Sequence, residues 1–341
     1  MFLLVSFEKI IRENLKNHIF KDIKGKENII YQLKSALSLG RHIILVGPPG
    51  VGKTTLAKSI SKILPEIEVS ECGFNCFVDE QSCPICKENK LKTKKLNERF
   101  IRIQGSPDLT AEDLLGDIDP IKAMKFGPLS IEAFTPGKIF KANKGILFFD
   151  EINRCPEKLQ NAMLQVLEEG KVTLGSYSFE LPADFILIAT MNPEDSSTEK
   201  LSDVFVDRFD FIYVNYPENV ETEKEIVNLR KSDIDISFPD KLFHFVVSFI
   251  HELRHNKDIE KKPSIRASIG LVDRSIANAY IKNKKQVDFN DIKESVVSVL
   301  SHRITLKPSL KYMKNQSDFI KEVFQNFSDK ELDDDLKGDV P

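Results

Sequence analysis

The sequence has no long hydrophobic run. None of its apolar stretches approaches the roughly 20 residues that a helix needs to cross a bilayer. The apolar opening from Met1 to Phe7 is stopped by Glu8 and Lys9, and it lacks the basic start and the length of a secretory signal. A net charge of −3 gives no overall attraction to nucleic acid or to an anionic membrane surface. We therefore expect a cytoplasmic protein with no membrane contact.

Cysteine is also scarce, since the 341 residues contain five, and four of these lie between positions 72 and 86. In a reducing compartment such a cluster indicates metal binding rather than disulfides. The spacing is Cys72-x3-Cys76-x6-Cys83-x2-Cys86, and four thiolates suit a tetrahedral Zn²⁺ with a structural role. An iron–sulfur cluster is the alternative metal interpretation, and four unligated thiols are the simplest one. The fifth cysteine, Cys155, is expected to be a small apolar residue.

The apolar runs that are present are short, and helical patterns separate them. Runs at 42–46, 100–103, 145–150, 185–190 and 209–214 are typical of buried strands. Strands that alternate with helices predict a parallel sheet covered by helices.

The pattern changes after Pro217, where the apolar spacing becomes helical and strand-like runs are scarce. The sequence therefore predicts an α/β domain at 1–216, a small helical lid domain at 217–307 and a polar tail at 308–341. The end of the tail is acidic and is expected to be mobile.

The segment after the first strand fits the phosphate-binding pattern G-x-x-x-x-G-K-[ST]. It reads Gly47-Pro48-Pro49-Gly50-Val51-Gly52-Lys53-Thr54. Glycines let backbone N–H groups turn inward around phosphate oxygens, and the next helix directs its positive N-terminus at the same anion. We expect Lys53 to reach the β- and γ-phosphates of ATP, Thr54 to ligate Mg²⁺ and Thr55 to lie at the nucleotide. The alternative is a chance glycine turn. The strand before the segment and the helix after it are the context that the phosphate-binding motif requires, and they argue against that alternative.

Two carboxylates, Asp150 and Glu151, end the third apolar run. Acidic groups at the end of a buried strand are costly unless something uses them. We expect Asp150 to hold Mg²⁺ through water, and Glu151 to orient or deprotonate the attacking water. A helix N-cap at the strand–helix turn is the alternative role.

Three further polar residues fit nucleotide sensing. Asn192 follows the fourth run, where a strand-terminal amide can position the lytic water; a turn asparagine before proline is the alternative. Arg208 is the candidate arginine finger. Arg266, which opens a helix in the second domain, is the candidate for reaching the γ-phosphate across the domain cleft. A surface salt bridge is the alternative for each arginine, in the case of Arg208 with Asp207 or Asp210.

The segment 87–102 is rich in basic residues and suggests contact with nucleic acid or an acidic partner. Because the basic residues are not interleaved with aromatic ones for base stacking, we interpret the segment instead as a solvated face. Its basic residues are Lys87, Lys90, Lys92, Lys94, Lys95, Arg99 and Arg102.

Together these motifs resemble the AAA+ family, and within it the MoxR and magnesium-chelatase branch, over about residues 25–305. The stretch from 113 through 137 resembles this branch's helix-2 insert, placed at about 117–140, and 171–182 resembles its β-hairpin before sensor 1. The motif residues are those of Ile146-Leu147-Phe148-Phe149-Asp150-Glu151-Ile152-Asn153-Arg154, Ala189-Thr190-Met191-Asn192-Pro193 and Asp207-Arg208-Phe209-Asp210.

The resemblance implies a homo-oligomeric ring, usually a hexamer, with ATP between subunits. It assigns Glu151, Asn192, Arg208 and Arg266 to catalysis and sensing. It also implies a remodelling role, often with a partner protein that carries a von Willebrand A domain. The cysteine insert at 72–86 departs from the pattern, although resembling inserts occur in some chelatase-like members.

The sequence therefore predicts a P-loop NTPase with an AAA+ core and a C-terminal helical lid. Its expected function is Mg²⁺-dependent ATP hydrolysis that remodels a partner protein or helps to insert a metal or cofactor into it. The ATPase subunit of a metal chelatase is the nearest alternative, and a nucleic-acid motor is a more distant one. A nucleotide-dependent switch with little turnover is a further alternative, against which Glu151 and Arg208 argue.

Overall fold

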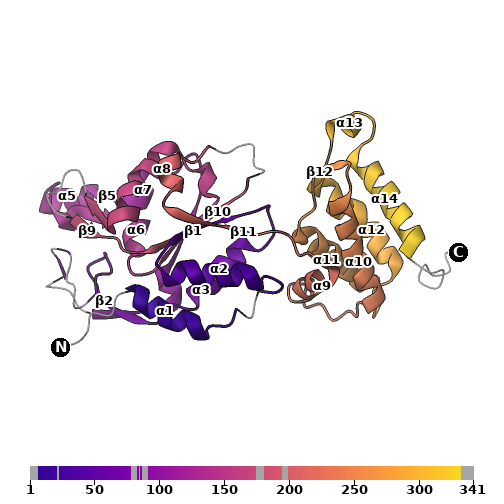
Figure 1. Cartoon of the computed structure of the whole chain (residues 1–341), viewed down its shortest axis with the longest axis horizontal. Helices are drawn as coiled ribbons and strands as arrows, with labels where there is room; N and C mark the ends of the chain where they lie inside the picture. Colours follow the sequence, from indigo (N-terminus) through magenta and orange to yellow (C-terminus); the bar gives the residue numbers. More distant parts are fainter. Residues whose placement is uncertain are drawn as a thin grey trace. The chain divides into compact units, whose positions relative to one another are not determined.

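The computed structural model describes residues 7–20, 23–77, 83, 85–86, 91–173, 180–193 and 199–331 (Figure 1). The chain divides into two compact units. The first consists of Met1–Pro48 and Gly52–Val214, and the second of Pro49–Val51 and Asn215–Pro341. Among the described helices, none is long and apolar enough to cross a membrane.

The first unit is built on a five-stranded sheet in the order β11-β1-β10-β7-β4, and every pairing in it is parallel. The three central strands are buried along nearly their whole length, whereas the edge strands β4 and β11 keep exposed positions. This agrees with the apolar runs in the sequence and confirms the predicted parallel α/β fold. The strands are β1 (His42–Val46), β4 (Phe100–Gln104), β7 (Ile146–Asp150), β10 (Ile186–Met191) and β11 (Phe209–Tyr213).

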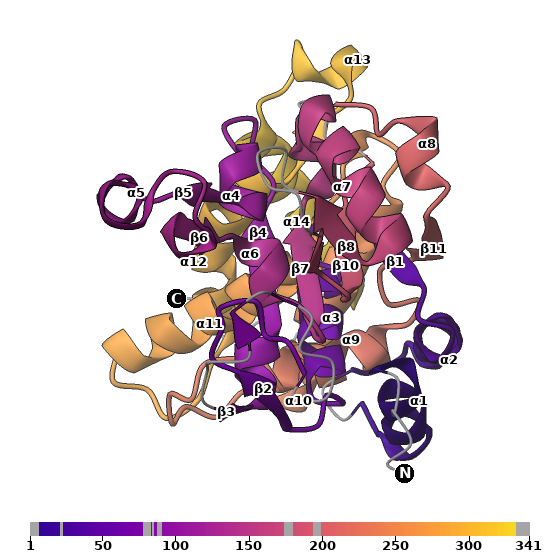
Figure 2. The same cartoon turned by 90° about the vertical axis from the view of Figure 1, so that its left-hand side faces the viewer.

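Helices cover this sheet, and Figure 2 shows the sheet and its helices from another side. The longest of them, α7, buries Leu159, Met163 and Val166 at helical spacing, which is why this segment folds as a helix with one apolar face. Gly170, in the left-handed conformation, ends it. Besides α5, described below, the helices of the unit are α1 (Phe7–Asn17), α2 (Glu27–Ser38), α3 (Lys53–Ser61), α4 (Ala111–Leu115), α6 (Lys138–Lys141), α7 (Glu157–Glu169) and α8 (Asp203–Val206).

Three small hairpins extend from this core. The first, β2 (Ile67–Ser70) with β3 (Leu91–Lys94), flanks the cysteine segment. In the second, β5 (Gly116–Ile118) pairs with β6 (Phe134–Pro136) and encloses α5 (Pro120–Phe126), which lies at the periphery in both views (Figures 1 and 2). The third pairs β8 (Lys171–Thr173) with β9 (Glu180–Pro182). The second and third hairpins lie where the sequence resembles the helix-2 insert and the sensor-1 hairpin.

The second unit is helical, with one short strand pair that the sequence did not indicate. Two of its helices begin at capping residues: the side chain of Asn219 accepts from Thr222 N at the start of α9, and Asp288 forms a capping box with Asp291 at the start of α12. The elements are α9 (Val220–Asn228), α10 (Asp240–His255), β12 (Ile259–Lys261), α11 (Ile265–Ile281), α12 (Phe289–Leu300), β13 (Thr305–Leu306), α13 (Pro308–Lys311) and α14 (Gln316–Glu331).

The prediction of a polar tail from residue 308 is wrong for α14. This helix buries Phe319, Ile320 and Phe324 in the hydrophobic core of the second unit. The Phe324 ring lies edge-on to Phe249, with centroids 5.1 Å apart. The prediction relied on the average composition of residues 308–341, which is polar. It therefore overlooked these regularly spaced apolar residues, which form one face of a helix. Residues 332–341 lie outside the described part of the chain.

Candidate functional site

The phosphate-loop residues connect β1 to α3, as the sequence predicts. Gly52 precedes α3 with a φ of 94°, a left-handed conformation that favours glycine. Gly47 lies so close to Val214 that a Cβ atom there would be 2.1 Å from the Val214 carbonyl oxygen. The ammonium of Lys53 curls back over the loop and donates to the carbonyl oxygens of Gly47 and Pro48, at 2.6 and 2.9 Å. The loop therefore has the backbone freedom and the basic side chain that a phosphate site needs.

Asp150 ends β7 beside the end of β10. Its side chain is 13% exposed, and each of its oxygens has a partner. Thr190 Oγ1 donates to Oδ1 at 2.7 Å, and Arg102 Nη2 lies 2.6 Å from Oδ2. Thr54, at the start of α3, and Asp150 both offer oxygen atoms, which are the donors that Mg²⁺ prefers.

Glu151 adopts a left-handed backbone conformation, with a φ of 57°, that is rare for a residue with a side chain. Its amide nitrogen donates to Thr190 Oγ1 at 2.9 Å. Its carboxylate accepts from Gln104 Nε2 at 3.1 Å and lies 3.4 Å from Arg154 Nε. Residues held in sparsely populated backbone regions tend to cluster at functional sites. Here the turn places the carboxylate of Glu151 at the end of the sheet, next to that of Asp150.

Asn192 follows β10, the strand between β1 and β7. Its carbonyl oxygen accepts from Asn153 Nδ2 at 3.1 Å, and the residue is half-buried. Because parallel strands end at the same edge of a sheet, the phosphate loop, the acid pair and Asn192 all lie along one edge.

Arg208 lies between α8 and β11, and its side chain is 22% exposed. Nη1 donates to the carbonyl oxygen of Val204 and Nη2 to Glu168 Oε2, both at 2.6 Å. The alternative interpretation of this arginine named Asp207 or Asp210 as its salt-bridge partner, whereas the ion pair that it forms is with Glu168 on α7. The guanidinium is thus held in a defined position at the surface of the first unit.

Arg266 lies in the first turn of α11, in the second unit, and is exposed. Its positive charge helps to lower the pKa of Arg303, although burial is the main cause of that shift. Its role toward the nucleotide stays a prediction.

The four clustered cysteines are buried, and their sulfur atoms all lie within 4.8 Å of one another. The sulfurs of Cys83 and Cys86 are 3.0 Å apart. Hydrogen bonds from Cys76 and Cys83 hold the pKa of the Cys72 thiol far below its ordinary value, while the bond to Cys72 raises the pKa of Cys83 to about 12. A zinc ion with four sulfur ligands at ~2.3 Å needs sulfurs roughly 3.8 Å apart. The donor set suits such an ion and all four sulfurs lie within 4.8 Å, although Cys83 and Cys86 are closer together than the ion would hold them.

Two asparagines tie the cysteine segment to the turn before β7. Asn143 Nδ2 donates to the carbonyl oxygen of Phe74 at 2.9 Å, and Asn75 Nδ2 donates to that of Lys141 at 2.8 Å. The Phe74 ring is buried and packs edge-on against Phe140. The cluster is therefore anchored to the core on one side.

The basic segment that was interpreted as a solvated face is not uniform. Arg99 is 1% exposed and donates to the carbonyl oxygens of Pro65 and Lys144, and Arg102 is paired with Asp150. That interpretation is therefore wrong for Arg99, whereas Arg102 is exposed although it is paired. Lys87 and Lys90 lie outside the described residues. Arg102 and Gln104 lie two residues apart on β4, so their side chains share one face of the strand. Their contacts with Asp150 and Glu151 depend on strand order and register, which the sequence did not reveal.

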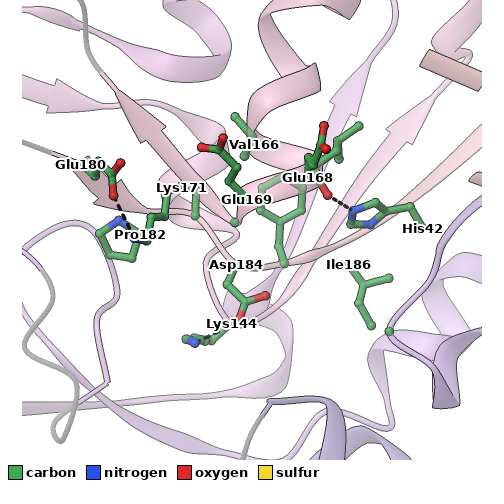
Figure 3. A pocket seen from close by; sticks show the side chains of 15 residues that line it. His42, Lys144, Val166, Glu168, Glu169, Lys171, Glu180, Pro182, Asp184 and Ile186 are labelled. Atoms are coloured by element: carbon green, nitrogen blue, oxygen red, sulfur yellow. Dashed lines mark hydrogen bonds and ion pairs between the residues drawn. The ribbon is translucent and has the colours of Figure 1, made fainter. Parts of the chain in front are cut away.

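A cavity of about 670 Å³ lies elsewhere in the first unit, between the end of α7, the β8–β9 hairpin and the beginnings of β1 and β10 (Figure 3). Strand beginnings lie at the edge of the sheet opposite the phosphate loop. Ion pairs between Lys144 and Asp184 and between Lys171 and Glu180 line it. This cavity is therefore separate from the candidate nucleotide site.

Comparison with known families gives three matches along the chain. Residues 85–211 match the ATPase family associated with various cellular activities (AAA), residues 19–99 match magnesium chelatase subunit ChlI, and residues 251–323 match the AAA lid domain. The third match lies within the second unit and includes part of α14.

Individual proteins are similar over most of the chain. The magnesium-chelatase subunit ChlI homolog of Methanocaldococcus jannaschii is 28% identical over 327 residues, which cover 85% of this chain and 86% of that protein. Chaperone MoxR1 of Mycobacterium tuberculosis is 25% identical over 316 residues, covering 83% and 73%. A variant of Thermotoga maritima RuvB has a similar fold, with a TM-score of 0.50, 18% identity and coverage of 84% of this chain and 73% of that one. Together the matches support an AAA+ ATPase related to the MoxR chaperones and to the ATPase subunits of magnesium chelatase.

Proposed function

We propose that this ATPase uses Mg²⁺-dependent hydrolysis to remodel a partner protein, as a MoxR-like chaperone. The observation that carries the proposal is the arrangement along one sheet edge: a phosphate loop after β1, an acid pair after β7 and Asn192 after β10. The similarity to Chaperone MoxR1 over 83% of the chain supports the chaperone role.

In this proposal each residue has one task. Lys53 and the loop amides bind the β- and γ-phosphates, with Thr55 next to them at the start of α3. Thr54 and Asp150 would hold Mg²⁺, which would offset the negative charge of the phosphates. Glu151 accepts a proton from the attacking water, and the Asn192 amide orients that water.

We further propose that the active form is a ring, with six subunits as the expected number. Arg208 would then serve the ATP bound to a neighbouring subunit, where a guanidinium offers fixed donors to the charge that develops on the γ-phosphoryl oxygens. The surface position of Arg208 and its anchoring by Glu168 support this role. Arg266 would contribute a second positive charge from the lid.

The cysteine cluster is proposed to hold one structural Zn²⁺ through Cys72, Cys76, Cys83 and Cys86. Four buried thiols within 4.8 Å of one another support this assignment. Because all four ligands come from the protein, no coordination position is open for substrate.

A metal-chelatase ATPase subunit is the second candidate function. The similarity to the chelatase subunit homolog, which covers 85% of this chain and 86% of that protein, favours it. The two candidates share the ATPase chemistry and differ in the partner, which would be a protein with a von Willebrand A domain for the chaperone and a large porphyrin-binding subunit for the chelatase.

The test uses Glu151→Gln, which should bind ATP and keep it bound without hydrolysing it. This variant is mixed with each of two purified candidate partners, a von Willebrand A protein and a porphyrin-binding chelatase subunit, with ATP and with ADP. ATP-dependent complex formation with the von Willebrand A protein alone supports the chaperone, and formation with the porphyrin-binding subunit alone supports the chelatase. Lys53→Ala serves as the control that should form neither complex. If a partner binds Glu151→Gln equally well with ATP and with ADP, and binds Lys53→Ala just as well, an ATP-driven role is contradicted.

A further inference from the structure

Arg102 forms an ion pair with Asp150 in this structure. It lies on β4, the strand next to β7, opposite Phe148 in the sheet register. Its Nη2 atom is 2.6 Å from Asp150 Oδ2, and its guanidinium carbon lies 6.0 Å from the centre of the Phe148 ring. Since Thr190 takes Oδ1, the ion pair with Arg102 accounts for the other oxygen of Asp150.

The two partners differ in how firmly they are held. Asp150 is 13% exposed and is fixed by the strand end and by Thr190, whereas 48% of the Arg102 side chain is exposed. Its guanidinium also lies against the Phe148 ring, and its distance of 3.5 Å to Gln104 Oε1 is at the limit of a hydrogen bond. Arg102 can therefore leave Asp150 by rotating its side chain, with no change to the sheet.

A guanidinium paired with this carboxylate repels a divalent cation that the same carboxylate holds through water, because both groups are positively charged. Resting on the proposed function, in which Asp150 helps to hold Mg²⁺, we propose that Arg102 is a positioning residue that neutralises Asp150 in the nucleotide-free chain and is displaced when the Mg²⁺–nucleotide complex binds. Arg102 thereby sets the Mg²⁺ concentration that nucleotide binding requires. Replacing it with a neutral side chain removes the competing cation.

The test measures equilibrium binding of a fluorescent ADP, which needs no hydrolysis, as Mg²⁺ is titrated. For Arg102→Gln, we expect half-maximal binding at a Mg²⁺ concentration roughly two- to fivefold lower than for the wild type, the range that a partly exposed ion pair is worth. Arg102→Lys, which keeps the charge, should stay within about twofold of the wild type. Lys314→Gln is the matched control, because it removes one charge from an exposed ion pair with Glu322 in the second unit.

Two results would overturn the inference. In one, Arg102→Gln leaves the Mg²⁺ dependence unchanged. In the other, it weakens ADP binding in EDTA, which would make Arg102 a direct phosphate ligand rather than a competitor of Mg²⁺. Asp150→Asn separates the inference from the proposed function. If that variant keeps the wild-type Mg²⁺ dependence, the role assigned to Asp150 fails, whatever the result for Arg102.

Discussion

A buried ionic network in the second unit gives a prediction whose size follows from the structure. Glu223 on α9 is fully buried, and Arg254 on α10 contacts both of its oxygens, with Nη2 2.7 Å from Oε1. His251 Nε2 lies 2.8 Å from Oε2, and the Ser268 hydroxyl donates to Oε1. Arg254 Nε also donates to the carbonyl oxygen of Pro263 at 2.9 Å, just before α11 begins. The network therefore joins α9, α10 and α11, the helix that carries Arg266.

The pKa of Glu223 gives the magnitude. Burial alone would raise it, but the hydrogen bonds from Arg254 and His251 outweigh that effect and lower the pKa from 4.5 to about 2. A folded-state pKa below the unfolded value adds stability that is fully present above about pH 4.5 and is lost as the pH falls toward 2. The difference corresponds to about 3 kcal/mol, or on the order of 10 °C in the unfolding temperature of a unit of this size.

The assay is thermal unfolding of the wild type and of Glu223→Gln between pH 2 and 7. We expect the wild type to be the more stable at neutral pH and its advantage to shrink as the pH falls below about 4.5. Arg254→Met should lower the free energy of unfolding more than Glu223→Gln does. Its total cost should be roughly 3–5 kcal/mol, because it leaves a buried carboxylate without its cation. The double variant Glu223→Leu/Arg254→Met should cost less than the sum of the single changes. A stability difference between wild type and Glu223→Gln that is constant from pH 7 to 2 would refute the reasoning.

The remaining predictions concern the proposed site. Glu151→Gln should bind ATP with near-normal affinity but turn it over at least 100-fold more slowly, whereas Lys53→Ala should lose binding itself; near-normal turnover in Glu151→Gln would remove the proposed base. Elemental analysis should find about one Zn²⁺ per chain in protein purified without chelators and none in Cys83→Ser/Cys86→Ser, and the absence of both zinc and iron from the wild type would exclude the metal site. Arg208→Ala should bind ATP but hydrolyse it roughly 10³-fold more slowly. Mixing it with Lys53→Ala should restore part of the turnover, because its intact phosphate loop can use Arg208 of a neighbour; no rescue in mixed rings verified by sedimentation would contradict the shared site.

The fold could be predicted from the sequence because the strands of the sheet are short apolar runs. The phosphate loop could be recognised because its glycines allow backbone conformations that other residues rarely adopt. The sequence also placed the acid pair correctly, since Asp150 and Glu151 end a buried run. It did not reveal which groups contact these carboxylates. Thr190 and Arg102 come from neighbouring strands, and their contacts depend on strand order and register, which local spacing does not encode. Helix α14 was missed for a different reason: its apolar residues form one face of a segment whose average composition is polar.

The cysteine cluster and the acid pair are connected to opposite ends of the same strand. Asn75 and Asn143 tie the cysteine segment to residues 140–143, and Arg99 binds the carbonyl oxygen of Lys144, two residues before β7 begins. Asp150 ends that strand, which is paired along its length with β4 on one side and β10 on the other. Because these strand pairings hold β7 independently of the β2–β3 hairpin, loss of the proposed Zn²⁺ should disturb the anchoring contacts at the beginning of β7 far more than the carboxylates at its end. The metal-free cysteine variant is therefore expected to unfold locally around residues 70–95 and to keep most of its ATP turnover.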